Sequence, residues 1–237
     1  MITRRKDYTK RAPSKDASKI YIISEGTDSE IKYLNFFVGL SSNLELIVIP
    51  SENGTDPVKL RELAKEKFFG TGRSHTIDYS QKDQIWFVID TDTWEKEGKI
   101  TPLREFCTTN NANISKEYDE VKPYDAWQVA QSNPCFEVWL YYHLYDEAPD
   151  IDSVPKEPNI KKYINSLIAG GFDYECDPTR IQLAIQRAKK SFRVDDDGKL
   201  EWFATEFFRL GEEIEKFTGN ETRKLLGKLT SGHMPMK

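Results

Sequence analysis

Hydrophobic and polar positions along the chain form segments that predict strands and helices in turn. Four segments are apolar and rich in β-branched or aromatic residues, as in strands covered on both faces: residues 19–24, 44–50, 84–90 and 125–132. Between them, apolar side chains recur three or four positions apart, the spacing of one helix face, at residues 28–40, 56–68 and 101–110. Strands that alternate with such helices predict a mostly parallel sheet flanked by helices.

From residue 133 onward the pattern predicts helices. The segment 133–144 has a helical period, and the acidic, proline-rich stretch 145–159 indicates a loop or a subdomain boundary. Further helices are predicted at residues 160–171, 178–192 and 201–217, and the polar residues 219–237 are expected to fray. The predicted organisation is a flexible arm over 1–18, a Rossmann-like α/β domain over 19–144 and a helical subdomain over 145–237.

The charge is distributed unevenly along the 237 residues. Residues 1–19 hold seven Lys or Arg and two acids, a balance of +5, so the net charge of −5 leaves −10 on the remainder. A basic arm before an acidic body indicates an anionic partner such as nucleic acid, or a tail that only keeps the protein soluble. Candidate nucleic-acid contacts are Arg4, Arg5 and Lys6 in the arm and Arg180 and Arg187 on a later helix.

Composition excludes several classes of protein. No stretch approaches the roughly 18 apolar residues that span a bilayer, and no apolar region follows the basic N-terminus, so a cytoplasmic protein without membrane contact is expected. The three cysteines are scattered among apolar neighbours, which favours buried, reduced thiols over disulfides or zinc ligands. The segment GTGRS (70–74) lacks the spacing and the lysine of a P-loop, so no ATP hydrolysis is expected.

Carboxylates stand where two predicted parallel strands end. Glu25 follows the first strand, and Asp90 and Asp92 follow the third. Ligands of open parallel sheets bind outside the carboxyl ends of the strands, and neighbouring strands are only about 4.8 Å apart. The three acids are therefore expected to converge on one small cation, and Mg²⁺ prefers such oxygen ligands. Gly26 then leaves room for a phosphate. The alternative for the two aspartates alone is a solvated turn.

Two more glutamates are candidates for the same site. Glu30 lies in the first turn of the following helix, where it would be a further metal ligand or only a favourable charge at a helix N-terminus. Glu137 lies at a helix start after the fourth strand, beside the same sheet edge. Just before it, Ser132 and Asn133 would bind phosphate or orient the acids, or else cap that helix. His143 is expected to be a structural helix residue.

These motifs resemble those of the Toprim domain, the metal-binding α/β module of topoisomerases, bacterial primases and OLD-family nucleases. The shared residues are the glutamate–glycine pair Glu25-Gly26 and the D-x-D of Asp90 and Asp92. Within that superfamily the chain resembles the RloB-like proteins of bacterial defence loci. The motifs are RRK (4–6), EGTDSEIKY (25–33) and SNPCFEVWLYYH (132–143), so the resemblance covers about residues 4–145.

The resemblance implies a nuclease that depends on Mg²⁺ or Mn²⁺. Glu25 would be a general acid or base or a metal ligand, Asp90 and Asp92 would be metal ligands, and Glu137 a further acid near the metal. Trp94 stands where topoisomerases often have a third aspartate, and the chain leaves little room for primase or topoisomerase domains. The expected function is an effector nuclease of prokaryotic antiviral defence that cuts RNA or DNA.

Two other functions stay open. A non-catalytic subunit would bind nucleic acid or an ATPase with the same fold. The intact acid set of Glu25, Asp90 and Asp92 favours the enzyme, whereas the shortened D-x-D and the acidic body leave this alternative open. A receiver-like phosphoacceptor would need a lysine after a later strand, but the fourth strand ends in AQSNP (130–134). RloB-like genes resemble those of other Toprim effectors in often lying near an AAA or ABC-type ATPase, which is the expected protein partner. The oligomeric state stays open, a homo-oligomer included.

Overall fold

The computed structural model describes residues 10–51, 56–91, 93–117, 124–150, 152 and 160–231. Strands and helices alternate in the first half of the chain: β1 (Ser18–Ser24), α1 (Ser29–Phe37), β2 (Leu44–Ile49), α2 (Pro57–Phe68), β3 (Gln84–Asp90), α3 (Ile100–Glu117) and β4 (Trp127–Ser132). The second half is helical: α4 (Glu137–Tyr141), α5 (Ile160–Leu167), the 3-10 helix η2 (Asp177–Arg180), α6 (Ile181–Ser191) and α7 (Phe207–Thr230).

The four strands form one parallel sheet in the order β2-β1-β3-β4. β1 and β3 lie in the middle, and β3 is buried along its whole length. Ser24 pairs with Val88 and Asp90 pairs with Ser132, so β1, β3 and β4 end at a common carboxyl edge. The α/β fold with a parallel sheet flanked by helices is thereby confirmed.

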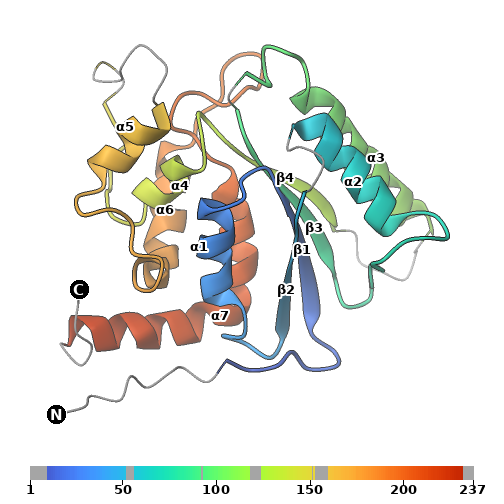
Figure 1. Cartoon of the computed structure of the whole chain (residues 1–237), viewed down its shortest axis with the longest axis horizontal. Coiled ribbons are helices and arrows are strands. Elements are labelled where there is room, and N and C mark those ends of the chain that lie inside the picture. The colour runs from blue at the N-terminus through green and yellow to red at the C-terminus, as the bar shows by residue number, and fades with distance from the viewer. Residues whose placement is uncertain are drawn as a thin grey trace.

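Helices cover both faces of the sheet and enclose two hydrophobic clusters. α2 and α3 lie on one face, whereas α1 lies on the other face with α4, α6 and α7 (Figure 1). Successive strand residues point to opposite faces. Ile20 and Ile22 of β1 therefore belong to the cluster on the α1 face, and Tyr21 and Ile23 to the cluster on the α2 face. Burial on both faces explains why the central strands have no polar side.

The C-terminal helices share their core with the sheet. Ile164 of α5, Ile185 of α6 and Phe207 of α7 are buried in the same cluster as Ile22 of β1. Residues 1–9 of the predicted arm lie outside the described residues, and the division of the chain at residues 18 and 144 stays a prediction.

Several helix boundaries differ from the sequence prediction. α4 spans only Glu137–Tyr141 of the predicted 133–144, and α5 ends at Leu167 rather than at residue 171. The expected fraying is wrong for residues 219–230, because they continue α7. Gly219, Thr222 and Leu225 are buried and form a narrow stripe along one side of this otherwise polar segment. The predicted helix over 101–110 is too short, since Ile114 extends the buried face of α3. α7 begins at Phe207 rather than at residue 201, because residues 203–206 hydrogen-bond to the end of β4 instead.

Two features considered from composition, membrane-spanning helices and the state of the thiols, can be examined in the described residues. None of their helices is long and apolar enough to cross a membrane. The three thiols are free, and those of Cys107 and Cys135 are buried, whereas Cys176 is only half-buried.

Candidate active site

Glu25 stands at the carboxyl edge directly after β1 and is held by the neighbouring strand. Its backbone N–H donates to the carbonyl of Val88 at 2.9 Å. Its Oε2 accepts a hydrogen bond from the backbone N–H of Asp90 at 3.0 Å, and its Oε1 accepts one from the indole N–H of Trp94 at 2.8 Å. Glu25 and Asp90 thus lie together, as the strand positions predict. Asp92 lies outside the described residues.

Asp90 is the last residue of β3, and only 2% of it is exposed. Its Oδ1 accepts a hydrogen bond from the backbone N–H of Phe136 at 2.8 Å, and its Oδ2 lies 2.6 Å from Nζ of Lys161. Burial raises the pKa of Asp90 well above its usual range. Lys161 opposes this rise, whereas the charges of Glu30 and Glu25 add to it. Burial thus opposes ionisation of Asp90, whereas the adjacent ammonium of Lys161 favours the ionised carboxylate.

Lys161 is a candidate that sequence reasoning missed. It is the second residue of α5, and its side chain is half-exposed. Burial lowers the pKa of Lys161, but the ion pair with Asp90 outweighs this effect and raises the pKa above its usual range. No motif or spacing could have revealed it, because α5 reaches the sheet edge only through the tertiary fold.

Glu30 is the second residue of α1, and its side chain turns inward until only 5% is exposed. It stands against the backbone of Gly26, since a Cβ at Gly26 would lie 1.9 Å from Oε2 of Glu30. Burial raises the pKa of Glu30 to about 7, and the charges of Glu137 and Glu25 add to the rise. Glu30 therefore lies in the first turn of α1 with a buried carboxylate that interacts with Glu137 and Glu25, and its role as a metal ligand stays a prediction.

Replacing Gly26 by alanine is expected to destabilise the fold by about 1–3 kcal/mol, because the new Cβ would displace the buried Glu30 carboxylate. Urea denaturation measures this change in the free energy of unfolding. In a Glu30→Ala background the same substitution is expected to cost less than about 0.5 kcal/mol. Equal costs in the two backgrounds would show that Glu30 is not the group that excludes a side chain at this position.

Glu137 begins α4 and is buried, with 6% exposed. Its Oε2 is buried and has no hydrogen-bond partner among the described residues. A buried carboxylate oxygen without a donor is costly, so it indicates a group that interacts with something other than the chain itself. The charge of Glu137 acts on Glu30 and on Lys161, which places Glu137 in the same site.

Glu25, Glu30, Asp90 and Glu137 together form what we call the acidic cluster. When all four are ionised, Lys161 compensates only part of their charge, and a bound cation would relieve the remaining repulsion. In the part of the chain that the structure describes, no three His, Cys, Asp or Glu side chains are grouped as a metal site. The oxygen-only donor set and the unpartnered Oε2 of Glu137 nevertheless fit a hard divalent cation such as Mg²⁺ or Mn²⁺ in their chemistry.

Ser132 and Asn133 hold the segment before α7 against the end of β4. The hydroxyl of Ser132 shares a hydrogen bond of 2.7 Å with that of Thr205. The side-chain amide of Asn133 donates to the carbonyl of Leu200 at 2.6 Å. Neither residue caps α4, whose N-cap position is Phe136. The phosphate contact predicted for Ser132 and Asn133 stays a prediction. The described hydrogen bonds give both residues a structural role.

The basic residues predicted to bind nucleic acid fall into two groups. Arg4, Arg5 and Lys6 lie outside the described residues. Arg187 of α6 donates to the carbonyls of Tyr142 and His143 at 3.1 and 2.8 Å, and its side chain is 17% exposed. It therefore ties the end of α4 to α6. Arg180, at the end of η2, is half-buried. Nucleic-acid binding by any of these residues stays a prediction.

His143 is the structural residue that the sequence predicts. It is fully buried, its Nδ1 lies 3.0 Å from the carbonyl of Trp139, and its Nε2 lies 3.1 Å from the hydroxyl of Tyr33. A carbonyl can only accept, so Nδ1 carries the proton and Nε2 accepts from the tyrosine. Burial lowers the pKa of His143 to about 3, so the ring is neutral at physiological pH.

The neutral state of His143 predicts a pH effect on stability. Between pH values of about 6.5 and about 3, the unfolded chain binds a proton that the folded chain does not, so the contribution of His143 to stability falls as the pH falls. The raised pKa of Glu30 acts in the opposite direction. Wild type and His143→Gln share that opposing effect and are therefore compared by urea denaturation at pH 7 and pH 5.

Wild type is expected to lose about 2 kcal/mol relative to His143→Gln between these two pH values. An unchanged difference would contradict a histidine that stays neutral in the folded chain.

The fold and the acidic cluster define a class of protein: an α/β protein with carboxylates at the edge of a parallel sheet and a helical second half packed on that sheet. The family model described as RloB-like protein matches residues 20–214. The chain therefore belongs to the RloB-like family. The match begins after the basic arm, so it leaves out the RRK motif at 4–6, and it continues past the expected end near residue 145 into most of the C-terminal helices. No curated protein and no solved structure matches the chain.

Proposed function

We propose that the protein is a Mg²⁺-dependent nuclease that acts as an effector in prokaryotic antiviral defence. The observation that carries this proposal is the acidic cluster at the carboxyl edge of the sheet, where Oε2 of Glu137 is buried without a partner among the described residues. Membership of the RloB-like family and the Toprim-like order of Glu25, Gly26 and Asp90 support the same proposal.

Asp90 and Glu137 are the residues that would hold the metal ion, with Glu30 and Asp92 as further carboxylates. The backbone N–H of Phe136 orients one oxygen of Asp90 and leaves the other directed at a cationic group, Lys161. When bound, Mg²⁺ would polarise a phosphate oxygen and lower the pKa of a water molecule.

Glu25 would act as the general base and accept a proton from the attacking water. The two N–H donors of Asp90 and Trp94 fix the plane of its carboxylate, and a general base must be held within hydrogen-bond reach of the proton that it accepts. Lys161 would bind the substrate phosphate, because its half-exposed ammonium can exchange a carboxylate partner for a phosphate oxygen.

RNA or DNA is the substrate class that the Toprim resemblance implies, and the basic arm would add backbone contacts to it. Signals from infection would reach the nuclease through a separate AAA or ABC-type ATPase, in keeping with the expected partner of RloB-like proteins.

A second candidate is a non-catalytic subunit that binds nucleic acid or that ATPase. The ion pair between Lys161 and Asp90 favours it, because Lys161 already supplies a cation to the carboxylate that would be a principal metal ligand.

The test is incubation of the purified protein with total RNA, plasmid DNA and single-stranded DNA, in Mg²⁺ or Mn²⁺ and again in EDTA. We expect cleavage of at least one substrate with metal and none in EDTA. Binding without cleavage under every condition, including with the partner ATPase present, would contradict the nuclease and support the binding subunit. Cleavage that persists in EDTA would contradict the metal requirement.

A further inference from the structure

The outer edge of β2 is a row of backbone groups that point away from the sheet. The N–H of Ser18 donates to the carbonyl of Asn43 at 3.1 Å, and the register continues with Ser18 beside Leu44. Odd-numbered residues of β2 therefore bond to β1, and the alternate residues Leu44, Leu46 and Val48 direct their N–H and C=O groups outward. β2 is the last strand on this side, so no described strand pairs with them.

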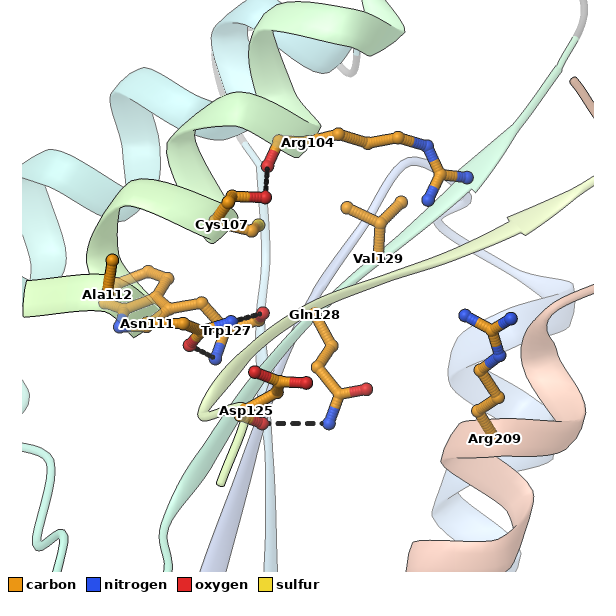
Figure 2. Close-up of a pocket in the computed structure, with 10 residues that line it drawn as sticks. Arg104, Cys107, Asn111, Ala112, Asp125, Trp127, Gln128, Val129 and Arg209 are labelled. Carbon is orange, nitrogen blue, oxygen red and sulfur yellow. Dashed lines mark hydrogen bonds between the residues drawn. The ribbon is translucent and has the colours of Figure 1, made fainter. Parts of the chain in front are cut away.

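At the opposite edge, β4 is protected by its own chain. The side-chain amide of Asn111 donates to the carbonyl of Trp127 and accepts from its N–H, each at 2.9 Å (Figure 2). Further along, the N–H of Glu206 donates to the carbonyl of Gln131 at 2.7 Å. Two of the three outward-facing residues of β4 are thereby satisfied. The fold thus protects one edge of the sheet and leaves the other edge without a partner among the described residues.

The sequence of β2 carries only one of the usual protections of an exposed edge, the charged side chain of Glu45. Its residues 44–49 read LELIVI, with no lysine, no proline and a regular ladder to β1. Monomeric proteins normally protect such edges with lysine, proline, bulges or a covering element. In Figure 1, α1 and α2 stand on the two faces of the sheet rather than across its β2 side.

We propose that β2 pairs with β2 of a second copy of this chain, antiparallel about a two-fold axis at Leu46. Leu46 then lies opposite the partner's Leu46, and Leu44 lies opposite the partner's Val48. Each of these outward-facing pairs exchanges two backbone hydrogen bonds. The two sheets become one continuous sheet through a contact that uses the same surface on both copies.

Two features suit β2 to pairing with a second copy of itself. On the α2 face, this register puts Glu45 opposite the partner's Ile47, so no like charges meet. A head-to-tail array would have to join β2 to the β4 edge of the next molecule. Asn111 and the segment 203–206 cover that edge, so the pairing closes at two copies.

A pair of charge substitutions at Ile47 tests this register. Ile47 is half-buried and would face the partner's Glu45 at a Cβ separation of about 5 Å. Ile47→Glu puts like charges opposite each other and is expected to weaken dimerisation at least about tenfold in Kd. Ile47→Lys removes the same apolar side chain but pairs with Glu45, so its Kd is expected to stay within about threefold of wild type. Sedimentation velocity over a concentration series measures both.

The double variant Glu45→Lys, Ile47→Glu restores opposite charges and is expected to recover the dimer. A wild-type chain that stays monomeric at all concentrations would overturn the proposal. So would a dimer that both single variants weaken equally, or that neither weakens, because its contact would then lie elsewhere. These measurements need no nuclease activity, so they stand apart from the test of the proposed function.

Discussion

Glu25→Gln is expected to lower the rate of nucleic-acid cleavage by about 10²–10⁴-fold, the range typical of losing a positioned general acid or base. Glutamine keeps the size of the side chain but cannot accept the proton. Its amide can also accept from only one side, so it would meet either the N–H of Asp90 or the indole N–H of Trp94 with a donor. The site therefore loses both its base and part of its orientation.

The measurement is the initial rate of cleavage on the substrate identified with wild type, at saturating Mg²⁺. Glu105→Gln is the matched control, because Glu105 is an exposed residue of α3 on the other face of the sheet from α1 and α4. It is expected to keep the wild-type rate. If Glu25→Gln cleaves at the wild-type rate and has a normal circular dichroism spectrum, Glu25 is not the general base of the reaction.

Trp139→Ala is expected to reduce the free energy of unfolding by about 3–5 kcal/mol, a large share of the stability of an ordinary domain. Trp139 is fully buried in α4, and its ring centroid lies 5.0 Å from those of His143 and Phe207. α7 approaches so closely that a Cβ at Gly211 would lie 3.1 Å from the Trp139 ring. The indole thus joins α7 to α4, the helix that begins with Glu137 of the acidic cluster.

The control is Trp202→Ala, the same substitution at a residue that is 46% exposed, and it is expected to cost less than about 1 kcal/mol. Urea denaturation followed by far-UV circular dichroism measures both. The sheet and the C-terminal helices share one cluster, so Trp139→Ala should shift a single transition to lower urea. Two separate transitions would show that the helical half unfolds on its own, and similar costs for the two variants would contradict the central packing of Trp139.

Much of the fold was open to prediction because its signals are local. The four strands are short apolar segments with polar ends, and Asp56 and Pro57 mark the start of α2, where the Asp56 side chain accepts from two backbone N–H groups. The end of α7 escaped prediction for the opposite reason. Thr222 and Leu225 are buried although their segment is polar, and a local average of polarity does not report which of its residues the fold buries.

The residues of the candidate site likewise fall into those that the sequence predicts and those that only the tertiary structure identifies. The sequence by itself determined that Glu25 and Asp90 end parallel strands and that Glu137 begins a helix, because strand ends and helix starts follow from periodicity and chain order. Only the tertiary structure decided that Glu30 turns inward against Gly26, that Lys161 pairs with Asp90, and that β2 rather than β4 has an open edge. These features depend on which segments meet in space, and a pattern of hydrophobic and polar positions specifies burial but not the partner.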